Sequence, residues 1–214
     1  MILRGSWRRT GAAIVAALWF GCGSAAAAPL QGSSRSAAEL MDAVMWNREP
    51  IGGAFELIDH TGKTRSDRDF RGQLLLVYFG FTFCPDICPT DLQAIGLAMD
   101  QLGADATKVQ PLFVTLDPER DTAEHLAQYV PMFHPRLIGL TGSAAAIHQA
   151  AEAYRVYYKR VAFEKSEAEY TVDHSAFIYL MGRDGNYLGF FPPGTSAEQI
   201  VGMIRPHLDE GKKR

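Results

Sequence analysis

The sequence has few cysteines, no excess of positive charge and no internal repeats. Only three of its 214 residues are cysteine, and the formal net charge at pH 7 is −3. Without a basic balance the chain has no electrostatic footprint for binding nucleic acid. The pattern Cys-x-x-Cys-His is also absent, so covalent haem attachment is not indicated. With 47% hydrophobic residues the chain can bury one good core, and one domain is the expected number.

The first 28 residues differ in kind from the rest of the chain. Three arginines fall among the first nine residues, an apolar stretch runs over Gly11–Gly21, and small residues fill Ala25–Ala28. This sequence of features is typical of an export signal. No charge occurs from Gly11 to Leu30, and such a run of about 20 residues can just span a bilayer. We therefore expect residues 1–28 to be an export signal or a membrane anchor. The domain that follows is expected in the periplasm, either released or anchored to the inner membrane.

Residues 29–50 are interpreted as a linker, and residues 51–210 as the domain proper. In the domain, continuous apolar runs predict buried strands and alternating runs predict half-exposed strands. The expected strands are Phe55–Asp59, a short strand around Thr64, Leu74–Phe79, Val109–Thr115, Leu137–Leu140, Ala176–Leu180 and Tyr187–Phe191. The expected helices begin at Pro89 or Thr90, follow an N-cap at Asp121 or Thr122, span Ala144–Tyr154, and follow a capping box at Thr195–Glu198. This order predicts an α/β thioredoxin-like fold, with a central mixed sheet flanked by helices and an N-terminal hairpin.

Cys84 and Cys88 lie on the turn between the apolar strand Leu74–Phe79 and the helix that follows it. Because proline is tolerated at the first helical position but not in the interior, the helix is expected to begin at Pro89 or Thr90. Both sulfurs then lie at or just ahead of a helix N-terminus, where the helix dipole lowers the pKa of a thiol toward neutrality. The thiolate binds metals and attacks disulfides, so this turn is expected to carry reactive sulfur.

The residues alone leave three interpretations of this pair open. The first is a small structural disulfide, although closing so short a loop stabilises a fold little. The second is disulfide exchange, but the oxidoreductase motif has two residues between its cysteines and this pair has three. Thioredoxins also place a cis-proline opposite the motif, where this sequence has Asp173-His174-Ser175. The third is a metal site of two thiolates and one imidazole, a donor set suited to copper as Cu(I) or Cu(II).

His174 is the imidazole that the predicted topology favours. It stands at the entrance to the strand expected beside the central one, so it should reach the same end of the sheet as Cys84 and Cys88. The alternative is a strand-edge histidine that makes one hydrogen bond. Zinc fits less well, because a closed structural zinc site takes four ligands. The other histidines are interpreted as surface residues: His60, His125, His134, His148 and His207.

Asp117 and Asp121 come at the end of the neighbouring strand, on the face that is expected to carry the site. Asp117 is a candidate outer-shell residue, which would orient the metal ligands or set the redox behaviour of the thiols. The alternative is a loop aspartate that pairs locally with Arg120.

Four short motifs follow one another along the domain. They are Phe-Gly-Phe-Thr-Phe-Cys-Pro-Asp-Ile-Cys-Pro-Thr (79–90), Leu-Asp-Pro-Glu-Arg-Asp-Thr (116–122), Gly-Leu-Thr-Gly (139–142) and Val-Asp-His-Ser (172–175). Together they resemble the Sco/SenC family, over residues 51–208. The chain departs from the family at Phe83, where many members carry histidine. The resemblance implies a thioredoxin-fold copper protein that helps to build the dinuclear copper centre of cytochrome c oxidase. It also implies one copper per chain, with Cys84, Cys88 and His174 as its ligands.

The same resemblance implies partners. The recipient would be the copper-bearing subunit of cytochrome c oxidase, and a donor chaperone would supply the copper. Because the periplasm is oxidising, an idle Cys84–Cys88 pair would close to a disulfide, so we also expect dependence on a periplasmic thiol reductant. A metallochaperone is favoured over an enzyme. The alternative function is a thiol–disulfide reductase that keeps the copper-site cysteines of the oxidase reduced, with Cys84 and Cys88 as its redox dithiol. A third function left open is a copper-responsive sensor or redox buffer.

Overall fold

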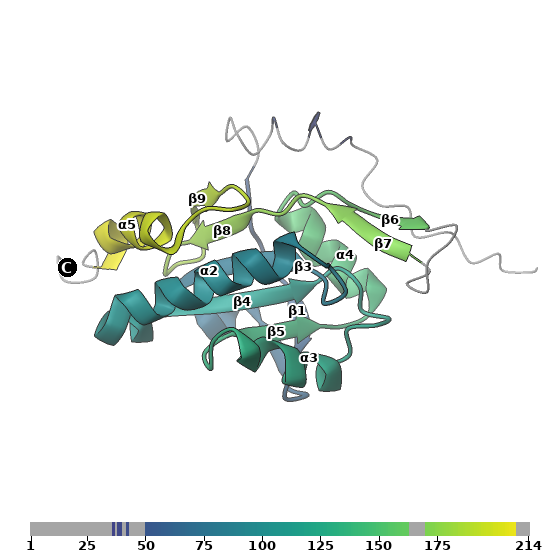
Figure 1. Cartoon of the computed structure of the whole chain (residues 1–214), viewed down its shortest axis with the longest axis horizontal. Coiled ribbons are helices and arrows are strands. Elements are labelled where there is room, and N and C mark those ends of the chain that lie inside the picture. Colours follow the sequence, from purple (N-terminus) through teal and green to yellow (C-terminus); the bar gives the residue numbers. More distant parts are fainter. Residues whose placement is uncertain (1–35, 37, 40–41, 43–49, 163–169, 209–214) are drawn as a thin grey trace, which may run out of the picture. The chain divides into compact units, whose positions relative to one another are not determined.

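The computed structural model describes residues 36, 38, 39, 42, 50–162 and 170–208. Its main feature is a seven-stranded mixed sheet with helices on both faces (Figure 1). The strands are β1 (Glu56–Asp59), β2 (Thr64–Ser66), β3 (Leu74–Gly80), β4 (Val109–Thr115), β5 (Ile138–Thr141), β8 (Ile178–Met181) and β9 (Tyr187–Phe191). Their spatial order is β2-β1-β5-β4-β3-β8-β9. Strands β3, β4 and β5 run parallel, and the outer strands pair antiparallel. The predicted mixed sheet and N-terminal hairpin are confirmed.

The centre of the sheet is buried on both faces. Every residue of β3 and of β4 is buried, as expected for continuous apolar runs in parallel strands that helices cover on either side. In β1, by contrast, buried and exposed residues alternate, because only one face of this strand packs on the core.

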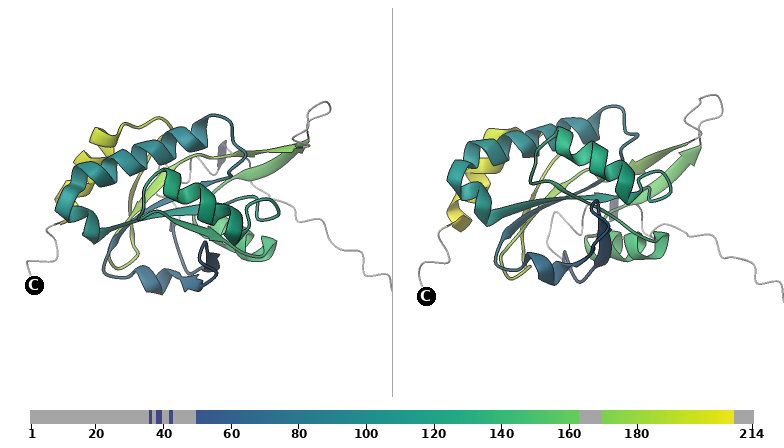
Figure 2. Two further views of the ribbon diagram at one scale, coloured as in Figure 1. Left: turned by 60° about the horizontal axis from the view of Figure 1, so that its bottom comes forward. Right: turned by 90° about the horizontal axis from the view of Figure 1, so that it is seen from below.

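The helices divide between the two faces. Helices α2 (Ile87–Leu102), α3 (Ala123–Tyr129) and α5 (Ala197–Leu208) cover one face, and α4 (Ala144–Ala153) covers the other (Figure 2). The connections from β3 to β4 and from β4 to β5 step across the sheet in one direction, so right-handed crossovers place α2 and α3 on the same side. Short 3-10 turns occupy Asp67–Phe70, Gly103–Lys108 and Val130–Met132. The last of these follows α3 and contains Pro131, which cannot continue the hydrogen bonding of an α-helix interior.

A separate two-stranded ribbon stands apart from this sheet. Strand β6 (Tyr158–Ala162) pairs antiparallel with β7 (Tyr170–His174), and Tyr158 lies opposite His174. Strand β6 is not expected from the sequence. Four of its five residues are exposed, so it carries no alternating apolar pattern.

Two predicted helix starts are wrong. Helix α2 begins at Ile87 rather than at Pro89 or Thr90, so Cys88 lies inside its first turn. The first N–H groups of a helix have no intrahelical partner, so Pro89 at the third position removes no hydrogen bond.

Helix α5 is capped one residue later than predicted. Ser196 N donates to Gln199 Oε1 at 3.1 Å, and Gln199 N donates to Ser196 Oγ at 3.4 Å, which is a reciprocal capping box. The hydroxyl of Thr195 donates instead to the carbonyl oxygen of Pro192, at 2.6 Å.

The export signal or anchor predicted for residues 1–28 lies outside the described residues, as does nearly all of the linker predicted for residues 29–50. Within the described part of the chain, no helix is both long enough and apolar enough to cross a membrane. The division of the chain into signal, linker and domain stays a prediction.

Candidate metal centre

The two cysteines lie on either side of the start of α2. The chain leaves β3 at Gly80, turns through residues 81–86 and enters α2. Cys88 is 0% exposed, whereas Cys84 on the turn is half-buried. Both are free thiols. The predicted place of the pair, between a buried strand and a helix, is confirmed.

The two thiols differ in acidity. The pKa of Cys84 is lowered to about 5, chiefly because its sulfur accepts a hydrogen bond from the Cys88 thiol. Burial opposes this effect, and the backbone N–H groups of Asp86 and Cys88 and the nearby His174 add to it. The pKa of Cys88 is raised, because Cys88 is the donor in this bond and because its sulfur is buried. The expectation that both pKa values fall is therefore wrong for Cys88.

His174, at the end of β7, meets the buried thiol. Its Nε2 lies 3.8 Å from Cys88 Sγ, across 86 residues of sequence. Its Nδ1 lies 3.2 Å from the carbonyl oxygen of Val172. A carbonyl can only accept, so Nδ1 carries the proton and the lone pair of Nε2 faces the sulfur. Burial lowers the pKa of His174, which favours the neutral ring. The ring of Phe81 packs edge-on against the imidazole at 5.7 Å.

These residues provide donors that fit a soft metal ion. Two thiols in hydrogen-bond contact and an imidazole nitrogen beside one of them are the ligand types that favour Cu(I). In residues 50–162 and 170–208, no three His, Cys, Asp or Glu side chains already form a group that could hold a metal ion. Cys84, Cys88 and His174 therefore lie near one another without forming a three-ligand group among the described residues.

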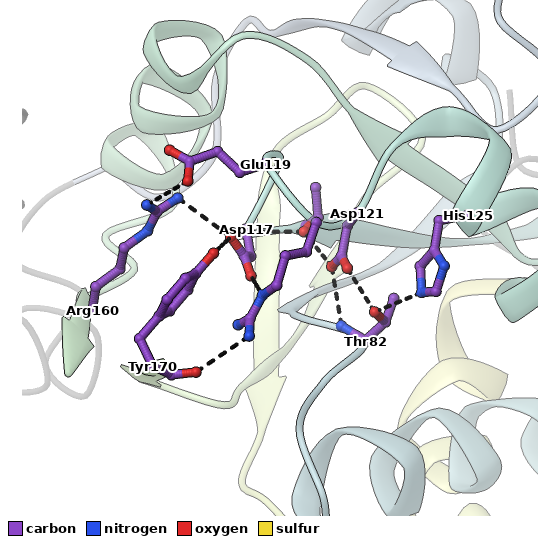
Figure 3. Close-up of polar contacts among 9 residues, drawn as sticks. Thr82, Asp117, Glu119, Asp121, His125, Arg160 and Tyr170 are labelled. Carbon is purple, nitrogen blue, oxygen red and sulfur yellow. Dashed lines mark hydrogen bonds and ion pairs between the residues drawn. The ribbon is translucent and has the colours of Figure 1, made fainter. Parts of the chain in front are cut away.

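Asp117 lies in a polar cluster beside the ribbon (Figure 3). Its buried carboxylate accepts hydrogen bonds from Tyr170 Oη at 2.8 Å, from Arg160 Nη2 at 3.3 Å and from Arg120 Nε. The guanidinium of Arg120 lies over the Tyr170 ring, 3.9 Å from its centroid, and Arg160 also pairs with Glu119 at 2.8 Å. The local pairing with Arg120 is therefore present, and Asp117 also contacts the strands of the ribbon.

Asp121 lies in a second cluster, together with Thr82 and His125 (Figure 3). Its buried carboxylate accepts from Thr82 N at 3.0 Å, from Thr82 Oγ1 at 2.6 Å and from Thr115 Oγ1 at 2.7 Å. Burial raises the pKa of Asp121, and these hydrogen bonds act against that rise. Thr82 Oγ1 also lies 2.9 Å from His125 Nε2, and the His125 ring stacks on Phe83 with centroids 5.8 Å apart.

Sequence reasoning missed the roles of Thr82, His125 and Tyr170 at this site. His125 and the other four histidines interpreted as surface residues are all half-buried. Two of them accept backbone N–H groups: His60 from Gly139 and His134 from Arg136, each at 3.1 Å. The sequence offered a signal for Thr82, because this residue falls within the cysteine motif at 79–90, two positions before Cys84.

Comparison with known proteins shows the family to which this chain belongs. A family model described as SCO1/SenC matches residues 44–209, which is more than half of the sequence. The chain belongs to the SCO1/SenC family. One curated relative is "Protein SCO2 homolog, mitochondrial" of Bos taurus, which is 49% identical over 158 residues, or 73% of this chain and 59% of the relative. The chain spans less than two thirds of the length of the mammalian relatives that it matches.

Two solved family members carry copper. ScoI of Bradyrhizobium japonicum, with copper bound, is 40% identical, has a TM-score of 0.68, and the match covers 73% of this chain and 99% of that one. Yeast Sco1 with copper bound is 36% identical, with a TM-score of 0.69 and coverage of 76% and 90%. Family membership confirms the resemblance found in the motifs, and these structures confirm the thioredoxin-like fold.

Proposed function

We propose that this chain is a copper metallochaperone. It binds one copper ion through Cys84, Cys88 and His174 and delivers it to the dinuclear copper centre of cytochrome c oxidase. The observation that carries the proposal is the 3.8 Å approach of His174 Nε2 to Cys88 Sγ, between residues that are 86 positions apart. The copper-bound solved relatives and the family membership support it.

Each donor has a distinct part in this function. The neutral imidazole offers the lone pair of Nε2 without first losing a proton. Cys84 is ready as a thiolate at neutral pH because its pKa is about 5. Cys88 keeps its proton until a metal displaces it, because metal binding deprotonates a coordinating thiol. Cys84 is also half-buried rather than enclosed, so a partner can replace the ligands one at a time, beginning with Cys84.

The cellular setting belongs to the same proposal. The domain works in the periplasm, receives copper from a donor chaperone and passes it to the copper-bearing subunit of the oxidase. Copper loading requires Cys84 and Cys88 as thiols, so a periplasmic thiol reductant keeps the pair open. Equal copper loading of the air-oxidised protein with and without added reductant would contradict this requirement.

The test is the copper content and optical spectrum of the purified, reduced protein beside Cys84→Ala and His174→Ala. We expect one copper per chain with thiolate-to-Cu(II) absorption. Both variants should lose copper affinity by more than the roughly 10–100-fold that outer-shell changes cost. His60→Ala is the matched control, because it removes a half-buried imidazole that accepts a hydrogen bond from Gly139 N instead. Full copper binding by His174→Ala would exclude the proposed ligand set.

A second candidate is a thiol–disulfide reductase that keeps the copper-site cysteines of the oxidase reduced. The observation that favours it is the unequal pair, with a half-buried Cys84 whose pKa is about 5 and a Cys88 that is 0% exposed. A low-pKa attacking thiol and a protected second thiol suit disulfide exchange. His174→Ala separates the two functions, because it should abolish tight copper binding yet keep most of the dithiol exchange with a model disulfide.

A further inference from the structure

We propose that the segment 116–122, between β4 and α3, positions both halves of the metal centre. Asp121 holds the turn that carries the cysteines, and Asp117 holds the ribbon that carries His174. The inference rests on the proposed function, since it concerns how these donors come together. It assigns positioning roles to Thr82 and Tyr170, which link the two aspartates to the donor elements.

The Asp121 half acts on the cysteine turn. Thr82 stands two residues before Cys84, and both its N–H and its hydroxyl donate to the Asp121 carboxylate, at 3.0 and 2.6 Å. Thr115 Oγ1, at the end of β4, donates to the same carboxylate at 2.7 Å and accepts Asp117 N at 2.9 Å. Asp121 is 0% exposed, so water does not compete for these bonds. The turn is therefore tied to the end of the central sheet.

The Asp117 half acts on the ribbon. Side chains alternate along a strand, so Tyr170, Val172 and His174 share one face of β7. Val172 on this face is 3% exposed, and His174 meets Cys88. Tyr170 at the other end donates its hydroxyl to Asp117 at 2.8 Å. Arg160 adds a second tie to Asp117 from the facing strand, at 3.3 Å.

The ribbon depends on these ties because β6 and β7 pair with each other as a sheet of their own. No ladder of the main sheet therefore extends into the ribbon, and side-chain contacts on its inner face add to the short chain connections that join it to α4 and β8. Loss of the Tyr170–Asp117 bond loosens the end of β7 opposite to His174, where Arg120 Nη1 still donates to the Tyr170 carbonyl oxygen at 3.2 Å. The imidazole then approaches Cys88 less often, and the metal site is complete in fewer molecules.

The contacts point to positioning rather than to coordination. Both oxygens of Asp117 accept hydrogen bonds, from Tyr170 and Arg160 on one and from Arg120 on the other. Both oxygens of Asp121 are likewise taken by Thr82 and Thr115. Each carboxylate is thus occupied, and its effect reaches the donors through Tyr170 or Thr82.

The test uses two mild variants of the full chain, Tyr170→Phe and Thr82→Val. Tyr170→Phe deletes one hydroxyl and keeps the ring that packs against Arg120. Thr82→Val deletes the hydroxyl between Asp121 and His125 and keeps the shape of the side chain. Thr82→Ser should restore the bond, and Thr171→Val removes a hydroxyl from the outward face of β7 as the matched control.

Copper binding gives the first readout. Chelator competition measures the affinity, and the optical and electron paramagnetic resonance spectra of bound Cu(II) report on its ligands. We expect each variant to bind copper roughly 10-fold more weakly, as is typical for outer-shell changes. Tyr170→Phe should weaken the histidine nitrogen hyperfine coupling while it retains the sulfur charge-transfer band. Thr82→Val should alter the sulfur band. Thr82→Ser and Thr171→Val should match the wild type.

The metal-free protein gives a second readout that does not depend on copper. Tyr170→Phe should speed amide hydrogen exchange in β7 and change the alkylation rate of Cys84 less than Thr82→Val does. Thr82→Val should change the alkylation rate of Cys84 without affecting β7.

The outcomes separate this inference from the proposed function. If Tyr170→Phe and Thr82→Val keep wild-type affinity, spectra and exchange, the positioning roles are overturned. If the wild type binds no copper but the variants loosen β7 and the cysteine turn as described, the proposed function fails and the positioning roles stand. If either variant loses its cooperative thermal unfolding, its bond serves the whole fold, which also overturns the specific role.

Discussion

A side-chain carbon added to Gly80 would lie 3.0 Å from Sγ of Cys88. The same carbon would lie 3.1 Å from ring atoms of Phe113 and of Tyr78. All three neighbours are 0% exposed, so none can move away without disturbing the core. The end of β3 must therefore lack a side chain for the sulfur to sit against it.

Gly80→Ala should consequently destabilise the protein and weaken its metal site. We expect a loss of about 1–3 kcal/mol in the free energy of unfolding, the usual cost of overpacking a core. Displacement of the Cys88 sulfur from His174 should also lower copper affinity. Urea denaturation and copper titration of the variant check the two effects.

Gly202→Ala is the matched control for this change. Gly202 lies in α5 with open space where a side chain would point. Alanine there should stabilise the helix by roughly 1 kcal/mol and leave copper binding unchanged. The prediction requires that Gly80→Ala destabilise the protein and that Gly202→Ala stabilise it. A stabilising Gly80→Ala would show that the site tolerates the extra carbon.

The two thiols should react with iodoacetamide at very different rates in the reduced, metal-free protein. Cys84 should alkylate with a pH midpoint near 5, because its thiolate is favoured by the Cys88 hydrogen bond. Cys88 should be protected by burial and by its raised pKa. In Cys88→Ala the midpoint for Cys84 should rise toward the ordinary thiol value of about 8.5. Peptide mass spectrometry follows both sites, and an unchanged midpoint in Cys88→Ala would refute the stated cause.

Asp59 should make stability depend on acid pH. Burial alone would raise the pKa of this carboxyl, but hydrogen bonds from Thr61, Arg65 and the backbone hold it well below its usual range. A lowered folded-state pKa stabilises the fold fully above the unfolded value of about 3.9, and this contribution is lost as pH falls further. At pH 7, Asp59→Asn should therefore cost about 1–3 kcal/mol.

Urea unfolding measured at about pH 7 and at about pH 2.5 checks this linkage. The stability gap between wild type and Asp59→Asn should narrow at the lower pH, because the Asp59 carboxyl of the unfolded chain is then protonated while the folded state still holds it ionised. Asp100→Asn is the control, because its carboxylate is 71% exposed and should contribute little at either pH. A gap of equal size at both pH values would mean that the charge of Asp59 is not the cause.

Ser196→Ala should destabilise the protein by roughly 1 kcal/mol through loss of the α5 cap. The structure places Ser196 and Gln199 in the capping box, rather than Thr195 and Glu198. Thr195→Ala should therefore cost less than Ser196→Ala. Thermal unfolding of both variants measures the order, and the reverse order would favour the cap predicted from the sequence.

Much of the fold could be predicted from local pattern. The apolar runs at β3 and β4 mark strands buried on both faces, and the hairpin of β1 and β2 follows from alternation and a turn. These features depend on residues a few positions apart, so the sequence displays them directly. Helix starts were less well predicted, since proline is compatible with several first-turn positions and two adjacent hydroxyl residues can each cap a helix.

The sequence by itself determined that Cys84 and Cys88 lie on a turn between a strand and a helix and which family the motifs resemble. It also indicated that His174 lies at the same end of the sheet as these cysteines. Only the tertiary structure decided that His174 Nε2 meets Cys88, that the two thiols differ in acidity and that Asp117 contacts the ribbon. Each of these depends on burial or on a contact between residues far apart in the chain. Sheet order and the docking of the ribbon create such contacts, and periodicity along the sequence carries no record of them.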